Sequence, residues 1–141
     1  MNAAVFDTNV LVSGLLSPHG PPGWLVDALQ QGLCRAVVDD RIWDEYVDVL
    51  TRPAFGFHPG DVDLFLGRLG EQALHAPLVP GTAPILALPD PTDAAFLECA
   101  AALRVPLVTG NLKHFPRRLV GRVEILSPAV CQRRLLREGH V

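Results

Sequence analysis

The stretch Ala3-Ala4-Val5-Phe6-Asp7-Thr8-Asn9 decides the fold. Its first four residues form an uninterrupted apolar run, which predicts a strand buried on both faces. The run ends abruptly in an acid, a hydroxyl and an amide, so we expect Asp7 at the carboxyl end of that strand. Ligands of open α/β sheets bind at this edge, because loops and helix N-termini converge there. We therefore expect other functional groups to meet Asp7 at this edge.

Length and composition predict one untargeted, soluble domain. With 141 residues and 49 % hydrophobic content, the chain can bury a sizeable core, and residues 1–141 are expected to form a single domain. The apolar runs fall well short of the roughly 18 residues that a membrane span needs, and no basic segment precedes an apolar stretch at the start. The three cysteines lack metal-ligand spacing, so they are interpreted as buried thiols of a cytoplasmic protein.

Charge is distributed unevenly along the chain. The formal net charge is -3, yet the segment from Lys113 onward has seven basic residues and two acids, which gives it +5 and the preceding residues -8. An acidic body suits a site that binds cations, and a basic flank suits contact with a polyanion. The alternative is that these arginines are simply solvated.

Short apolar runs alternate with helical patterns along the rest of the chain. Buried strands are predicted at 35–38, 105–108 and 123–126, with a possible short strand at 75–79. Helices are predicted at 10–16, from Trp24 to Gly32, at 40–50, at 61–74, from Asp90 onward, and after Ser127. This alternation of strand and helix indicates an α/β fold with a parallel sheet.

The helix predicted at 40–50 carries one acid beside its apolar stripe. Asp44 and Asp48 fall on the opposite face at about 100° per residue, whereas Glu45 lies at the border of the stripe. Glu45 is therefore the acid of this helix that can reach a crevice beside the core. The alternative is a boundary glutamate that extends into water.

The stretch Asp90-Pro91-Thr92-Asp93 opens another helix. Asp90 fits the N-cap and Pro91 the first helical position, while an acid at Asp93 can reach back to the cap. Capping alone would explain both acids. A helix between two parallel strands nevertheless points its N-terminus at the carboxyl edge of the sheet, so Asp93 is expected both to cap the helix and to face Asp7.

The turn Thr109-Gly110-Asn111 follows the strand predicted at 105–108 and reaches the same edge as Asp7, Glu45 and Asp93. Converging carboxylates repel one another unless a divalent cation binds between them. Hard oxygen ligands select Mg²⁺ or Mn²⁺ over zinc. Such an ion would bind a scissile phosphate and lower the pKa of a bound water.

Taken in order, these motifs resemble the PIN domain. The stretches that carry the resemblance are Asp7 to Ser13, Glu45 within a helix, Asp90 to Asp93 ahead of Phe96-Leu97, Thr109 to Phe115, and Ile125 to Pro128. More narrowly, they resemble bacterial PIN proteins assigned as toxins of toxin–antitoxin systems.

The resemblance implies a three-layer α/β/α fold with a central, mainly parallel sheet of about five strands. It also implies a Mg²⁺- or Mn²⁺-dependent endoribonuclease for single-stranded RNA, usually a homodimer and the partner of an antitoxin protein. The implied catalytic residues are Asp7, Glu45 and Asp93, and the implied metal ligands are these three and Asn111. Supporting residues would be Thr8, Asn9, Ser13, Asp90, Thr109 and His114. The basic residues expected to guide the RNA backbone are Lys113, Arg117 and Arg118.

The sequence departs from the resemblance at the fourth acid. Relatives have an aspartate where Asn111 or His114 stands, so this site carries one negative charge fewer. One alternative function is therefore an RNA- or protein-binding module with a weakened site. Another is a haloacid-dehalogenase-like phosphohydrolase, although that family has a second aspartate where Asn9 stands.

Overall fold

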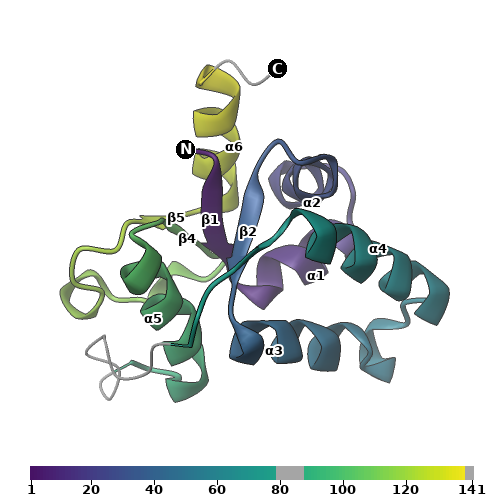
Figure 1. Ribbon diagram of the computed structural model, residues 1–141, viewed down its shortest axis with the longest axis horizontal. Coiled ribbons are helices and arrows are strands. Elements are labelled where there is room, and N and C mark those ends of the chain that lie inside the picture. The colour runs from purple at the N-terminus through teal and green to yellow at the C-terminus, as the bar shows by residue number, and fades with distance from the viewer. Residues whose placement is uncertain (79–87, 139–141) are drawn as a thin grey trace.

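The computed structural model describes residues 1–78 and 88–138, and its core is a five-stranded, all-parallel sheet (Figure 1). Its strands are β1 (Ala3–Phe6), β2 (Arg35–Val38), β3 (Leu74–His75), β4 (Leu107–Val108) and β5 (Ile125–Leu126). They lie in the order β3-β2-β1-β4-β5. The chain thus winds outward on one side of β1 and then returns to its other side, which leaves a crevice at the carboxyl ends of β1 and β4.

Six α-helices of the described residues cover the sheet in two layers. They are α1 (Thr8–Leu16), α2 (Pro21–Gln31), α3 (Asp40–Leu50), α4 (Pro59–Gln72), α5 (Ala94–Leu103) and α6 (Pro128–Arg137). Helix α2 packs against α4 and α6, while α3 packs against α5, which in turn contacts three strands. The three-layer α/β/α architecture is therefore confirmed. No helix within residues 1–78 and 88–138 combines the length and apolar character that a membrane crossing requires.

Four short 3-10 helices complete the described elements and shape the site edge. They are η1 (Pro53–Phe55), η3 (Pro91–Asp93), η4 (Leu112–His114) and η5 (Arg117–Leu119). Helix η3 leads directly into α5, and η4 follows the polar turn after β4. The helix predicted from Asp90 onward is therefore divided into a 3-10 turn, η3, and the α-helix α5.

The predicted elements occur in the predicted order, but several boundaries were wrong. The helix predicted at 61–74 ends at Gln72, because Ala73 has an extended backbone, and Leu74 already belongs to β3. Val79, the predicted end of that strand, lies outside the described residues. The strand predicted at 105–108 is shorter because Pro106 has no N–H to donate, although its carbonyl accepts a hydrogen bond from Val5.

The start of one helix and the start of one strand also differ from the prediction. The first helix begins at Thr8, because the N–H of Val10 already bonds the Asp7 carbonyl. The predicted strand at 123–126 begins only at Ile125, since Val123 closes a turn onto the Val120 carbonyl. In α6, Leu135 is buried, whereas Leu136 is exposed.

The core is continuous and includes all four residues of β1. Tyr46 of α3 is fully buried and donates a hydrogen bond to the carbonyl oxygen of Phe6, which fixes α3 beneath the end of β1. The three cysteines are free and buried, and burial raises the pKa of each thiol to about 12. They are therefore inert core residues.

Candidate active site at the carboxyl edge of the sheet

Asp7 lies where the sequence places it, directly after β1 and next to the end of β4. Phe6 pairs with Val108, so the following residues, Asp7 and Thr109, are neighbours across the sheet. The Thr109 hydroxyl donates to Asp7 Oδ2 at 2.8 Å, and Asn9 Nδ2 donates to the same oxygen at 3.3 Å. Asp7 is only 5 % exposed, and this burial raises the pKa of its carboxyl group despite the opposing hydrogen bond from Thr109.

The turn after β4 is tied to the start of α1. The N–H of Gly110 donates to Asn9 Oδ1 at 3.0 Å, and the N–H of Asn111 donates to the Thr109 hydroxyl at 3.0 Å. Asn9 and Thr109 therefore support Asp7 by orienting both the carboxylate and the neighbouring turn. Ser13 lies one helical turn beyond Asn9 and is exposed.

Asp90, Asp93 and His114 form the closest group of potential metal ligands in the described part of the chain. One ligand atom from each lies within 4.8 Å of the others. His114 Nδ1 is 2.9 Å from Asp93 Oδ2, while Asp90 Oδ1 accepts hydrogen bonds from the Thr92 N–H and hydroxyl. The prediction that Asp90 caps the helix start is confirmed. The prediction that Asp93 also caps was wrong, because its carboxylate turns to His114 instead.

The carboxyl group of Asp93 links this group to Asp7. Asp93 is 7 % exposed, and its pKa is raised to about 6, first by burial and then by the negative charges of Asp7 and Asp90. His114 opposes this shift by charge and by its hydrogen bond. The remaining repulsion among the three acids is the condition that a bound cation would relieve. Two carboxylates and an imidazole therefore fit a divalent cation.

Glu45 faces the same side of the molecule. Thr8 Oγ1 donates to Glu45 Oε2 at 2.5 Å, so the residue after Asp7 holds this carboxylate. Glu45 also lines a cleft of about 300 Å³ between α3 and the start of α5, together with Pro91 and Thr92. Asp44 and Asp48 are exposed, as the helical period predicted. A common metal shared by Glu45, Asp7 and Asp93 stays a prediction.

An ion-pair network between a partly exposed arginine and two buried acids lies beside this cleft, and it was not predicted from the sequence. Arg41 donates to Asp39 Oδ2 and Glu98 Oε1, both at 2.8 Å, and the two acids are each 3 % exposed. Burial lowers the pKa of Arg41, but its hydrogen bonds to the two carboxylates outweigh this effect and raise it. Asp39 also caps α3 through the Ile42 N–H. Because Asp39 and Arg41 lie at the start of α3 and Glu98 lies in α5, the network joins the helix that carries Glu45 to the helix that follows Asp93.

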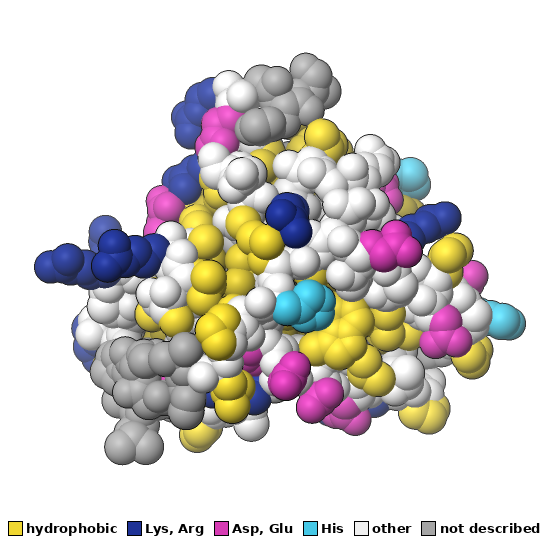
Figure 2. All heavy atoms as spheres, in the orientation of Figure 1, with side chains coloured by type: hydrophobic (Ala, Val, Ile, Leu, Met, Phe, Trp, Pro, Cys, Tyr) yellow, Lys and Arg dark blue, Asp and Glu magenta, His cyan; other side chains and the backbone are white. Residues whose placement is uncertain are grey.

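The predicted RNA-contacting residues lie just beyond His114. Lys113 is in η4, Arg117 and Arg118 are in η5, and all three are exposed. Figure 2 shows Lys and Arg side chains projecting from the side of the molecule that carries α5, β4 and β5, while Asp and Glu side chains gather over α3. On the face shown, basic and acidic side chains thus gather mainly over different elements.

Asp93→Asn should stabilise the metal-free protein by an amount that grows with pH. An unfolded aspartate titrates near 3.8 and folded Asp93 at about 6, so between these values the folded chain binds more protons and loses stability as pH rises. Asparagine does not ionise, so the variant does not lose folding stability through this group as the pH rises. Thermal melts in a chelator should show a gain near zero at pH 4 that rises to a plateau above pH 6. A gain that does not vary with pH, or an equal gain from the exposed control Asp63→Asn, would contradict the assigned environment.

Comparison with known proteins agrees with this geometry. Residues 3–113 match the sequence model of the PIN domain. The search of curated proteins and the search of solved structures each gave no match. PIN domains are generally nucleases and typically depend on a divalent metal. Since the match spans well over half of the 141 residues, the chain belongs to the PIN-domain family.

Proposed function

We propose that the chain is a metal-dependent endoribonuclease that cleaves single-stranded RNA at the carboxyl edge of the sheet. The observation that carries the proposal is the environment of Asp93. Its buried carboxyl group is repelled by the negative charges of Asp7 and Asp90 and is hydrogen-bonded to His114. Such repulsion is tolerated at a site that binds a cation. Family membership supplies the nuclease chemistry, and the family assignment leaves the phosphohydrolase alternative without support.

Asp93, Asp90 and His114 would hold the ion, with Asp7 as a further ligand and Glu45 across the cleft. A bound Mg²⁺ or Mn²⁺ would supply charge neutralisation at the scissile phosphate and a water of lowered pKa. The residues of this chain position the reaction: Thr109 and Asn9 orient Asp7, His114 orients Asp93, and Thr8 holds Glu45. The test compares single-stranded RNA with a fully paired duplex of the same sequence in Mn²⁺. Cleavage confined to the single strand supports the proposal, and equal cleavage contradicts the stated substrate.

We also propose that the chain is a homodimeric toxin controlled by an antitoxin protein, and that it acts in the cytoplasm. The ordered motifs shared with bacterial PIN toxins support the first part, and three free, buried thiols suit a reducing compartment. Growth arrest on expression, relieved by a small protein encoded beside this gene, would support the toxin role. Light scattering on the purified protein measures its molar mass, and a mass of twice that of one chain would support the dimer.

We propose further that residues 1–141 form one PIN domain, although the family match ends at residue 113. Helix α6 lies beyond the match, yet it packs against α2 and contributes Cys131 and Leu135 to the core. Ser127 caps this helix by accepting a hydrogen bond from the Val130 N–H, as the sequence predicted. Truncation before Ser127 should therefore expose core residues and reduce stability.

Asn111→Asp should tighten Mn²⁺ binding and raise the cleavage rate. The site has a neutral amide where acidic relatives have a carboxylate, and Asn111 is fixed to Thr109 only by its backbone N–H. A new carboxylate would add charge and a hard oxygen ligand. Calorimetry on wild type, Asn111→Asp and His114→Ala at pH 6 and pH 8 measures this. If all three show the same affinity and stoichiometry at both pH values, Asn111 and His114 are structural, and the weakened-module alternative gains support.

Reversing the charges of Arg117 and Arg118 should weaken RNA binding and flatten its dependence on salt. Each phosphate contact on a single strand contributes about 0.7 to the slope of log affinity against log salt, because bound counterions are released. Losing two contacts should therefore lower the slope by roughly 1.4. Arg52→Glu with Arg68→Glu, exposed positions on the α3–α4 side, is the matched control. Equal slopes for both double variants would mean that Arg117 and Arg118 do not contact RNA.

A further inference from the structure

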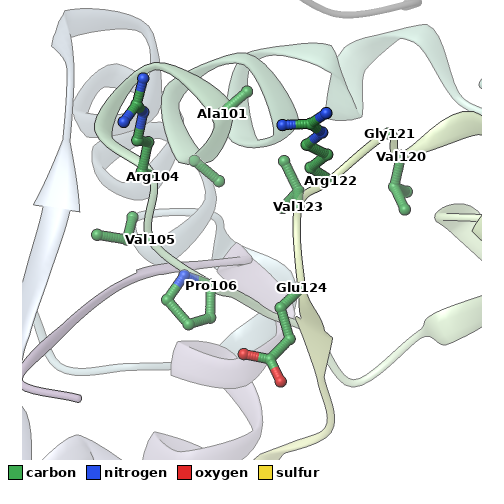
Figure 3. A pocket seen from close by; sticks show the side chains of 10 residues that line it. Ala101, Arg104, Val105, Pro106, Val120, Gly121, Arg122, Val123 and Glu124 are labelled. Carbon is green, nitrogen blue, oxygen red and sulfur yellow. The ribbon is translucent and has the colours of Figure 1, made fainter.

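A hollow of about 680 Å³ lies at the amino edge of the sheet, at the opposite ends of the strands from Asp7 (Figure 3). It is bounded by the end of α5, the connection to β4, and the turn that precedes β5. Small apolar side chains line it, among them Ala101, Val105, Pro106 and Val123. Its volume falls within the range of small-molecule sites, and the nuclease proposal makes no use of it.

Two unpaired arginines stand at this hollow. Within the described ranges, neither the Arg104 side chain nor the Arg122 side chain has a hydrogen bond or an ion pair. In Figure 3 the guanidinium groups of Arg104 and Arg122 both lie in the upper part of the view, with Ala101 between them. The carboxylate of Glu124 points toward the lower part of the view, away from both. Glu124 is bound by Arg134 through contacts of 2.6 and 2.7 Å, so it does not neutralise the pair. The hollow therefore combines an apolar lining with two free guanidinium groups.

The backbone of Arg104 gives independent support for a role of its side chain. It has a left-handed conformation with φ 55°, the only non-glycine residue in the described chain with positive φ. It caps α5 through its N–H, a position where glycine is normally favoured because it has no side chain to clash. An arginine here costs folding free energy that glycine would avoid. Residues with a strained backbone conformation are found more often where their side chains have a function.

We propose that this hollow binds a nucleotide, with its phosphate between Arg104 and Arg122 and its base on the apolar lining. Guanidinium groups form paired, charge-assisted hydrogen bonds with phosphate oxygens, and their planes also stack on bases. The adjoining hollow of about 580 Å³ shares Arg104 and adds Arg137, another arginine without an ion pair in the described residues. The nucleotide can be free or the end of an RNA strand. Because the site lies at the far edge, the proposal does not rest on the nuclease activity.

Calorimetry with AMP in a chelator tests this site while leaving the acidic edge without metal. We expect one AMP per chain, bound more tightly than inorganic phosphate or adenosine alone. Arg104→Gly with Arg122→Gln should weaken AMP binding roughly a hundredfold, since each charged hydrogen bond lost is worth at least about tenfold. Glycine suits the backbone at 104, so this variant should fold at least as well as wild type, which a thermal melt checks.

Arg52→Gln with Arg68→Gln removes the same charge elsewhere and should leave AMP affinity unchanged. No AMP binding at millimolar concentration, equal binding by the two double variants, or inorganic phosphate that binds as tightly as AMP would each overturn the proposal. A 5′-phosphorylated RNA oligonucleotide distinguishes the two sources. If it displaces AMP, the site takes an RNA end, and if it does not, the site takes a free nucleotide.

Discussion

Arg41→Leu lowers the free energy of unfolding by about 3 kcal/mol, the lower end of the range for buried pairs, because the Arg41 side chain is itself partly exposed. The substitution leaves the carboxylates of Asp39 and Glu98 buried without their shared cation, and both are only 3 % exposed. Removing one partner of such a pair costs this much, because each buried carboxylate loses the charge of Arg41 and water cannot fully replace it. Urea unfolding monitored by circular dichroism measures the change, with an unchanged m-value showing that the transition remains comparable.

Arg52→Leu is the matched control for this prediction. Arg52 pairs with Asp48 at 2.9 Å, but both side chains are more than half exposed. An exposed pair of this kind is worth about 0–1 kcal/mol. If Arg41→Leu costs no more than Arg52→Leu, the network does not hold α3 to α5. Adding Glu98→Leu to Arg41→Leu should recover part of the loss, because one of the two buried carboxylates that lost their contact with Arg41 is then removed.

Asp7→Asn reduces the rate of RNA cleavage at least about a hundredfold and leaves the fold intact or more stable. Losing even a group that only supports a metal ligand typically costs 10–100-fold in metal affinity or activity, so loss of a ligand carboxylate should cost more. The fold survives because an asparagine oxygen can still accept the hydrogen bonds from Thr109 and Asn9. Neutrality also removes a charge that burial disfavours.

Cleavage assays in Mn²⁺ and melts in a chelator together measure this second prediction. Asp93→Asn should behave in the same way, whereas Asp63→Asn, an exposed acid on α4, should match wild type in both assays. Retained cleavage in Asp7→Asn and Asp93→Asn would refute the assignment of the active site. A loss of cleavage accompanied by a lower melting temperature would instead show that Asp7 is structural.

The carboxyl-edge site could be anticipated because local patterns determine its position. An apolar run that stops at Asp7, and another that stops at Thr109, place both residues at one edge of a parallel sheet. The helical period likewise separated Glu45 from the exposed Asp44 and Asp48. These inferences need only the direction of a strand and the period of a helix.

Pairings between distant turns could not be anticipated in the same way. The contact of His114 with Asp93 depends on two separate 3-10 turns, η3 and η4, whose geometry leaves little trace in composition. Glu98 was missed because its partner, Arg41, lies 57 residues away. A signal was present, since Glu98 is the one charged residue in α5, and a buried charge requires a partner.

The most direct test of the proposed activity is the rate at which the purified wild-type chain cleaves single-stranded RNA with and without a divalent metal. We expect no cleavage in excess chelator, recovery when Mn²⁺ or Mg²⁺ is restored, and no recovery in an Asp93→Asn preparation purified in parallel. Cleavage that persists in chelator, or that the Asp93→Asn preparation shares, would contradict the claim that the acids at this edge carry out metal-dependent RNA cleavage.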